Sequence, residues 1–302
     1  MELSQLRMFA MAAELQSFTR AAEAMFVTQP AVSRQVAMLE HELGVSLFQR
    51  MGRGVSLTAA GRNMYDSTRR ALELLDAASR EIGDTPDVVS GTVHLASCTI
   101  PSQTFLPGLL ASFRRSYPQI RESVNVTGAA EAARAVETGD ADLGFIVVQP
   151  PSDHLSTKMI ACHQLVLAVP PEHRLAKCSL IDADQLRDEP FVMREAGSGT
   201  RQCIEQALMD IGISRNDLTV ALETNSDSTI REVVKQGAGL AFLSPPAIQD
   251  DVDHGRLVVV ATDVCVRVNI YVVSDPNHVP TPAVRAFLAF INRTDADRNG
   301  NL

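Results

Sequence analysis

A short helix near the N-terminus carries polar residues of the types that recognise bases in DNA. Thr28 and Pro30 mark its start, because threonine is a good N-cap and a proline in the first turn loses no hydrogen bond. In the first half of such a helix, arginine can pair bidentately with guanine, glutamine can pair with adenine, and serine can bond a base or a phosphate. We therefore predict a recognition helix that contacts DNA through Gln29, Pro30, Ser33 and Arg34. The alternative is that these side chains are merely solvated.

A second informative run, Arg194-Glu195-Ala196-Gly197-Ser198-Gly199-Thr200-Arg201, lies in the C-terminal half. It follows an apolar strand pattern and precedes a helical one, so small residues would place backbone N–H groups and two hydroxyls at a helix N-terminus. Such a helix start can hold an anion, and we predict that Arg194, Ser198, Thr200 and Arg201 contact a ligand. The alternative is that Ser198 or Thr200 simply caps the helix.

Signatures of catalysis and of metal binding are weak. Gly197–Thr200 lacks the spacing of a serine-hydrolase elbow, and Gly237–Gly239 lacks the third glycine of a dinucleotide loop. The 7 histidines and 5 cysteines show no metal-ligand spacing and no disulfide framework. We expect a protein that is not an enzyme and needs no metal or cofactor, and a redox-sensing pair of cysteines stays open as an alternative.

Three short helices and a hairpin are predicted to position the recognition residues. Apolar spacing predicts helices at about 3–13, 20–25 and 28–43. Only Phe26 and Val27 separate the last two helices, which forces a steep crossing typical of a helix-turn-helix. Strand patterns at 46–50 and 55–57 predict a β-hairpin wing, whose Arg50 and Arg53 suit contact with phosphates or the minor groove.

Thr58 is predicted to cap a long helix that reaches to about Asp84. Its apolar residues are spaced alternately by four and three positions, and Thr68 occupies one position of this pattern. The apolar residues are Met64, Ala71, Leu75, Ala78 and Ile82. We expect that this helix cannot bury its apolar seam within its own chain, and that it pairs with a second copy.

From Gly91 the chain alternates apolar strand patterns with helical ones, which predicts mostly parallel sheets covered by helices. The predicted strands lie at 92–96, 123–126, 143–148, 165–169, 191–192, 240–244 and 269–273. In open sheets of this kind, ligands collect at the carboxyl ends of strands. Further ligand contacts are therefore predicted at Ser97, Thr99, Ile100, Thr127, Gly128, Ile146, Asn225, Ser226 and Thr229.

The N-terminal residues resemble the LysR-type transcriptional regulators over nearly all of residues 1–65. The resemblance is carried by Ser17–Ala22, Val27–Val36, Leu39–Glu40, Leu43–Gly44, Leu47–Arg50 and Leu57–Gly61. It implies a winged helix-turn-helix, a dimerising linker helix and a two-lobed effector domain similar to periplasmic solute-binding proteins, commonly assembled as tetramers. Runs similar to Arg194–Arg201 occur in the subgroup that includes regulators of sulfur assimilation and carbon fixation, which respond to small anions or phosphorylated metabolites.

The predicted fold class is therefore α+β multidomain. We expect a winged helix-turn-helix at 1–58, a linker helix at 59–89 and a bilobed α/β effector domain at 90–302. In relatives the chain crosses twice between the lobes. Crossings near His163–Gln164 and Val266–Arg267 would give lobe one 90–163 with 267–302, and lobe two 164–266. The expected partners are double-stranded DNA, an anionic small-molecule effector and further copies of the chain, as a homodimer or homotetramer.

Composition limits how DNA can be bound. The net charge is −9, but residues 1–58 carry 5 arginines and 5 glutamates, so DNA affinity must come from clustered arginines presented by a dimer. No apolar run approaches the roughly 20 residues that span a bilayer, and no basic segment precedes an apolar block at the N-terminus, so we expect a cytoplasmic protein. Two alternatives stay open: a solute-binding or enzymatic second half, or a constitutive repressor with a vestigial pocket.

Overall fold

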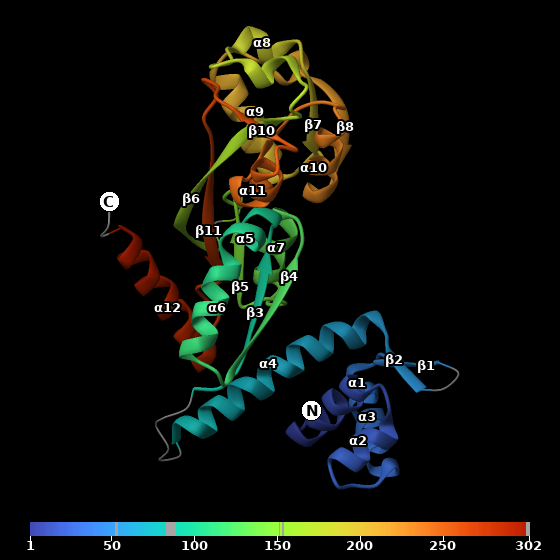
Figure 1. The fold of residues 1–302 in the computed structure, drawn as a ribbon. Helices are drawn as coiled ribbons and strands as arrows, with labels where there is room; N and C mark the ends of the chain where they lie inside the picture. The colour runs from blue at the N-terminus through green and yellow to red at the C-terminus, as the bar shows by residue number, and fades with distance from the viewer. Residues whose placement is uncertain (52–53, 83–88, 151, 153, 300–302) are drawn as a thin grey trace. The chain divides into compact units, whose positions relative to one another are not determined.

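The computed structural model describes residues 1–51, 54–82, 89–150, 152 and 154–299. These residues form two compact units, 1–91 and 92–302. The first unit is mostly helical with a small hairpin, and the second contains a long sheet covered by helices (Figure 1). Each unit has hydrophobic clusters of its own.

The N-terminal unit is the predicted winged helix-turn-helix followed by a long helix. Its elements are α1 (Leu3–Leu15), α2 (Phe18–Ala24), α3 (Gln29–Leu43), β1 (Phe48–Met51), β2 (Gly54–Leu57) and α4 (Ala59–Ile82). Ala21 and Ala22 of α2 are buried, and they pack in one cluster with Phe9 of α1 and Val36 of α3. Because alanine side chains are small, the three helices can approach closely, as the steep crossing requires.

Two side chains fix the wing and the start of α4. Glu40 Oε1 accepts hydrogen bonds from the backbone N–H groups of Leu47 (2.6 Å) and Phe48 (3.0 Å). Thr58 Oγ1 accepts from Gly61 N–H at 2.9 Å, which confirms Thr58 as the helix cap, and it donates to the Ser46 carbonyl at 2.7 Å. A Cβ on Gly61 would lie 2.0 Å from the Leu47 carbonyl oxygen, so only glycine allows this close approach.

One expectation for α4 was wrong in part. Met64 and Tyr65 pack against the helix-turn-helix core, so the first half of the apolar face is covered by the unit's own helices. Further along the helix, the side chain of Leu75 is 46% exposed. Leu75 is therefore an exposed apolar position of α4, and we expect a second copy of the chain to pack there.

The C-terminal unit contains a seven-stranded sheet and a two-stranded one. The large sheet has the order β10-β6-β11-β5-β3-β4, with β9 beside β6, and the small one pairs β7 with β8. The strands are β3 (Gly91–Ser97), β4 (Ile120–Val126), β5 (Leu143–Ile146), β6 (Ser156–Val169), β7 (Pro190–Arg194), β8 (Thr219–Thr224), β9 (Ala241–Leu243), β10 (Val258–Val260) and β11 (Val266–Ser274). The strands β8, β10 and the first half of β6 were not predicted from the sequence.

Eight α-helices of this unit lie within the described residues. They are α5 (Thr99–Thr104), α6 (Leu106–Ser116), α7 (Ala129–Glu137), α8 (Ala183–Arg187), α9 (Gly199–Asp210), α10 (Asp227–Lys235), α11 (Pro245–Asp253) and α12 (Pro282–Asn299). We call β3 to β5 with α5, α6, α7 and α12 lobe one, and the elements from α8 to β10 lobe two. The strands β6 and β11 run through both lobes (Figure 1).

The prediction of mostly parallel sheets was wrong. The pairs β3–β5 and β7–β8 are parallel, but β6 pairs antiparallel with β9, β10 and β11, and β11 pairs antiparallel with β5. The reason is that β11 brings the chain back along β6 in the opposite direction. The register pairs Gln164 with Arg267 and Leu165 with Val266, so the two predicted crossing points lie side by side.

The exposed Leu75 of α4 generates the first prediction. Leu75→Asp is expected to weaken dimerisation of a 1–89 fragment, because a carboxylate would replace an apolar side chain in the helix pair. Analytical ultracentrifugation at roughly tens of micromolar measures the association. Ser67→Asp, an exposed position of the same helix, is the matched control and should leave the dimer intact. A wild-type fragment that stays monomeric would contradict the prediction.

Candidate DNA-binding surface and ligand cavity

The start of α3 presents its polar residues on the surface of the N-terminal unit. Gln29, Pro30 and Arg34 are exposed, and Gln29 Nε2 donates to Ser33 Oγ at 2.8 Å. The Arg34 side chain forms no hydrogen bond or ion pair with any residue that the structure describes. Its guanidinium group is therefore available to an external acceptor, as base or phosphate recognition requires.

The hairpin beside α3 forms as predicted, with Phe48 to Met51 paired antiparallel to Leu57 to Gly54. The backbone of Arg50 pairs with Val55, and Arg53 lies outside the described residues. The predicted contacts of both arginines stay predictions. A residue that sequence reasoning missed is Phe26, which is 96% exposed in the turn before α3 and has a positive φ of 55°.

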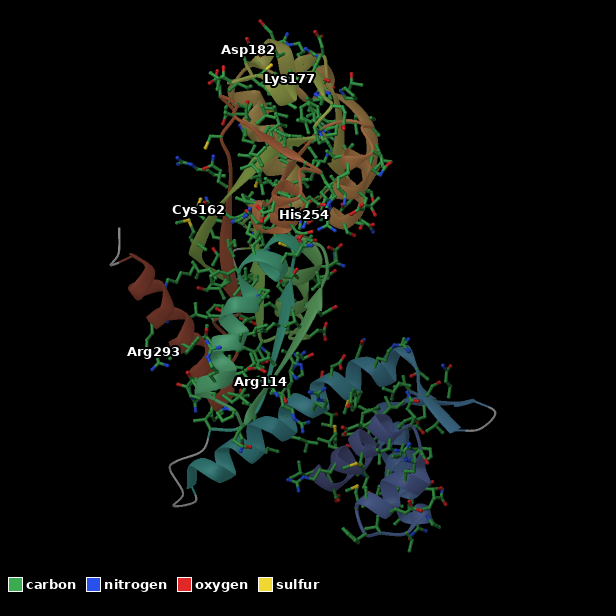
Figure 2. All side chains as sticks on the ribbon, in the orientation of Figure 1. Arg114, Cys162, Lys177, Asp182, His254 and Arg293 are labelled. Atoms are coloured by element: carbon green, nitrogen blue, oxygen red, sulfur yellow. The ribbon has the colours of Figure 1, made fainter. Side chains whose placement is uncertain are left out.

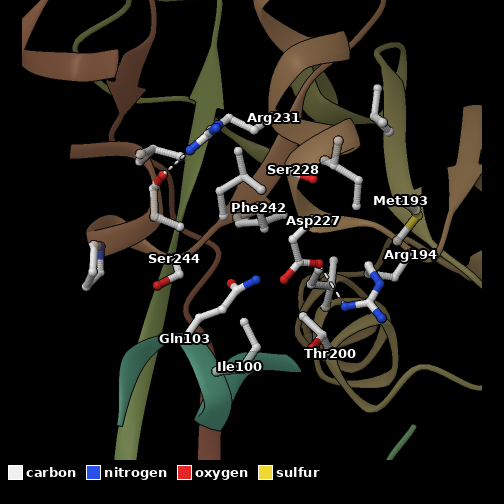
Figure 3. A pocket seen from close by; sticks show the side chains of 17 residues that line it. Ile100, Gln103, Met193, Arg194, Thr200, Asp227, Ser228, Arg231, Phe242 and Ser244 are labelled. Carbon is white, nitrogen blue, oxygen red and sulfur yellow. Dashed lines mark hydrogen bonds and ion pairs between the residues drawn. The ribbon is translucent and has the colours of Figure 1, made fainter. Parts of the chain in front are cut away.

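A cavity of about 390 Å³ lies between α5 of lobe one and several elements of lobe two (Figure 3). Its volume falls in the range of small-molecule sites. Polar groups line one part: Gln103, Arg194, Thr200, Asp227, Ser228, Arg231 and Ser244. The remaining wall is apolar and includes Ile100, Ile204, Ile230 and Phe242. A site of this composition suits a compact molecule that has both polar groups and an apolar surface.

The buried arginine in the cavity wall is neutralised by two carboxylates. Arg194 Nε lies 2.9 Å from Glu195 Oε2, and Arg194 Nη1 lies 2.7 Å from Asp227 Oδ1. Burial raises the pKa of the Asp227 carboxyl group, and the Arg194 charge opposes that rise. Arg194 therefore holds Glu195 and Asp227 in place, and its charge is already shared when a ligand arrives.

The second predicted arginine is also occupied. Arg201 Nε lies 2.6 Å from Glu205 Oε1, and Arg201 Nη1 donates to the Arg194 carbonyl at 2.9 Å and bonds Glu223 of β8. Arg201 does not line the cavity. These contacts join the first turn of α9 to the ends of β7 and β8.

The first turn of α9 is left without caps. Ser198 makes no side-chain capping bond, and Thr200 lies inside the helix, so neither residue provides the simple cap considered as the alternative. In the described part of the chain, the N–H groups of Gly199, Thr200 and Arg201 have no hydrogen-bond partner. Thr200 is 7% exposed and lines the cavity, and its hydroxyl group has no hydrogen-bond partner among the described residues.

A histidine at one of the predicted crossings, which was not predicted as a site residue, contacts the cavity wall through Ser244. His163 Nε2 lies 2.8 Å from Ser244 Oγ, and burial lowers the pKa of His163. His163 stands on β6 where the chain enters lobe two, and Ser244 lines the cavity. The side chain therefore links the long connecting strand to the cavity wall.

Comparison with known families decides what the two units are. Residues 3–62 match the bacterial regulatory helix-turn-helix protein, lysR family, and residues 86–296 match the LysR substrate binding domain. The chain belongs to the LysR family of transcriptional regulators. As a LysR-type regulator it joins a DNA-binding helix-turn-helix to an effector-binding domain.

Individual relatives of this LysR-type regulator point to one subgroup. The chain is 32% identical over 257 residues to the transcriptional activator CmpR of Synechocystis, covering 85% of this chain and 83% of CmpR. It is equally similar, at 32% over 256 residues with the same coverages, to the RuBisCO operon transcriptional regulator of Allochromatium vinosum. The regulatory domain of Synechocystis CcmR, solved in complex with 2-PG, has a TM-score of 0.61 and 26% identity, covering 68% of this chain and 98% of CcmR's. The resemblance to carbon-fixation regulators is confirmed.

The cavity gathers three of the effector contacts predicted for this LysR-type regulator, Ile100, Arg194 and Thr200. The others lie outside its lining: Ser97, Thr99, Thr127, Gly128, Ile146, Ser198, Arg201, Asn225, Ser226 and Thr229. Ser97 and Ile146 are fully buried, and Ser226 caps α10 by accepting from Thr229 N–H at 3.2 Å. Sequence reasoning missed Gln103, Asp227 and Ser244, and a polar residue at a predicted helix start was the available signal for Asp227.

The cysteines show no arrangement that favours redox sensing. All five are free, and burial raises the pKa of Cys98 to about 12 and raises that of Cys203. Since the thiolate is the reactive form, burial disfavours the reactive form of these two thiols. Within the described residues no group of three or more histidine, cysteine or acidic side chains could hold a metal ion, and no helix could cross a membrane.

The unpaired guanidinium of Arg34 generates the second prediction. Arg34→Ala is expected to lower affinity for a preferred duplex by about 1–3 kcal/mol and to relax its sequence preference. Arg53→Ala should weaken binding evenly across sequences. It should also reduce the slope of the logarithm of the binding constant against the logarithm of the salt concentration by about 1. Gel-shift titrations of the full-length protein at several salt concentrations, on duplexes selected from random sequence, measure both effects.

Arg115→Ala is the control for these titrations, because this exposed arginine lies on α6 of the other unit. It should leave DNA binding unchanged. If Arg34→Ala retains both affinity and sequence preference, the assignment of α3 as the base-reading helix is wrong.

Proposed function

We propose that this regulator responds to a compact organic anion seated in the 390 Å³ cavity, with the acid group of the ligand at the start of α9. The observation that carries the proposal is the uncapped first turn, with the partnerless and nearly buried Thr200 hydroxyl beside it. Unpaired N–H groups and the positive end of the helix dipole favour an anion there. Because Arg194 and Arg201 are shared with carboxylates, the backbone N–H groups and Thr200 are the free donors at the start of α9.

The size and lining of the cavity favour a carbon-containing effector over an inorganic ion. Sulfate or sulfite would occupy a small part of a 390 Å³ space and leave the wall at Ile204, Ile230 and Phe242 uncovered. A phosphorylated or carboxylated metabolite would cover this wall and place its acid group at α9. The complex of the similar CcmR domain with 2-PG supports a small-molecule effector for the present chain.

Effector binding is proposed to act by closing the two lobes. Ile100 and Gln103 come from lobe one, and the other cavity residues come from lobe two, so a ligand that contacts both sides stabilises their approach. We propose that closure changes the arrangement of DNA-binding units in a dimer or tetramer, without turnover of the ligand. The proposed boundaries are 1–58 for the DNA-binding domain, 59–89 for the linker helix, 90–163 with 267–302 for lobe one, and 164–266 for lobe two.

Calorimetry on the full-length protein tests the effector class. The panel is sulfate, sulfite, thiosulfate, phosphoenolpyruvate, a sugar bisphosphate and a neutral amino acid. We expect an organic anion to bind, and we expect Thr200→Val to weaken it about tenfold, the loss of roughly 1.4 kcal/mol that one hydrogen bond to a charged group provides. Thr219→Val, an exposed position on β8, is the isosteric control and should bind normally. Binding of neutral compounds alone, with Thr200→Val silent, would refute the proposal.

The close approach of α9 to lobe one generates a further prediction. A Cβ on Gly199 would lie 2.7 Å from Val147 Cγ2 and 3.0 Å from Val148 Cγ2, both stiff β-branched side chains. Gly199→Ala is therefore expected to destabilise this arrangement by about 1–3 kcal/mol and to weaken effector binding. Thermal unfolding with and without ligand measures both quantities.

Gly108→Ala is the matched control, because the added Cβ would meet nothing within 4 Å in the interior of α6. It should stabilise the protein by about 0.5–1 kcal/mol through helix propensity and leave ligand binding unchanged. If Gly199→Ala behaves like Gly108→Ala, the contact between α9 and lobe one plays no part in effector binding.

A further inference from the structure

The carboxylate of Asp227 is only half satisfied by the protein. Asp227 is the first residue of α10, its side chain is 14% exposed, and it forms part of the cavity wall. One oxygen, Oδ1, accepts from Arg194 Nη1 at 2.7 Å. The other oxygen has no hydrogen-bond partner within the described residues, and Figure 3 shows it directed into the cavity toward Gln103.

The charge around this oxygen is not balanced by the protein. Arg194 is a single cation, and it also bonds Glu195 through Nε at 2.9 Å and Nη2 at 3.1 Å. Arg231 is the other cation in the cavity wall, and its Nη1 donates to the Ala247 carbonyl at 3.0 Å. Its Nη2 lies 3.4 Å from Glu232 Oε1, and its Nε lies 3.4 Å from Asp251 Oδ2. A buried carboxylate oxygen without a donor is costly, so a bound ligand that lacks a donor would be disfavoured here.

We propose that Asp227 is a specificity-determining residue that accepts a hydrogen bond from a hydroxyl or ammonium group of the effector. The proposal rests on the function proposed above, because it takes the same cavity as the effector site. It narrows the ligand class to organic acids or phosphates that carry a hydrogen-bond donor on their carbon skeleton. The acid group meets the start of α9, and the donor meets α10.

Three probes that differ at one carbon test this assignment by calorimetry on the full-length protein. 3-Phosphoglycerate carries a hydroxyl at C2, O-phosphoserine carries an ammonium there, and 3-phosphooxypropionate carries hydrogen. We expect the first two to bind at least about tenfold more tightly than the third, since a site with an unpaired acceptor rejects a ligand that lacks the donor. This comparison uses the wild-type protein and needs no variant.

A matched pair of variants separates a direct contact from an effect through Arg194. Asp227→Asn replaces the oxygen that faces the cavity, and it should abolish the preference for the probes with a donor. Glu195→Gln removes the other carboxylate from Arg194 but does not touch the cavity wall, so it should preserve the preference. If both variants lose the preference for probes with a donor to the same extent, Asp227 only orients Arg194 and the inference is wrong.

The outcomes distinguish this inference from the proposed function. If all three probes bind equally and Thr200→Val weakens all of them, the anion site stands and the role of Asp227 is refuted. If neither these probes nor any other anion binds, the proposed function fails and the inference falls with it. If only 3-phosphoglycerate and O-phosphoserine bind tightly, and Asp227→Asn loses this preference, the result supports both the anion site and the role of Asp227.

Discussion

The guanidinium group of Arg201 anchors the first turn of helix α9, and the proposed anion site depends on where that helix begins. By bonding Glu205, Glu223 and the Arg194 carbonyl, it joins the helix to the ends of β7 and β8. The first turn then has no protein cap, and its N–H groups stay unpaired beside Thr200. The charge of Arg201 is thus used within the protein, and we propose that the neutral donors beside it bind the anion. Pre-organised donors of this kind lose little entropy when a ligand binds.

The sequence was sufficient to predict the N-terminal unit almost completely, because its signals are local. The N-cap at Thr28, the two-residue link at Phe26 and Val27, and the alternating wing strands each depend on neighbours within a few residues. The same holds for the first turn of α9, where glycine and hydroxyl residues between a strand and a helix pointed to the correct helix start. The crossing points near Gln164 and Arg267 came from family resemblance, and the register pairs them directly.

The remaining features depend on residues distant in sequence. Besides their local partners Glu195 and Glu205, Arg194 bonds Asp227, 33 positions away, and Arg201 bonds Glu223, 22 positions away. The local pairs could have been predicted from the sequence, whereas the distant ones depend on the fold. Gln103 enters the cavity because α5 of lobe one faces lobe two. The antiparallel return of β11 along β6 also escaped the strand patterns, since an apolar strand carries no mark of its direction. Each of these misses is a tertiary contact that local propensity does not encode.

Hydrogen exchange at the start of α9 measures directly whether the backbone N–H groups of residues 199–201 bind the anion. Backbone N–H groups that bind an anion exchange more slowly, whereas those that stay in water are unaffected. The full-length protein would be compared with and without the tightest-binding anion, using overlapping peptides that resolve the amides of residues 199–201. We expect the strongest protection at these three amides and a loss of that protection in Thr200→Val. Protection confined to other segments, with residues 199–201 unchanged at saturating ligand, would contradict it.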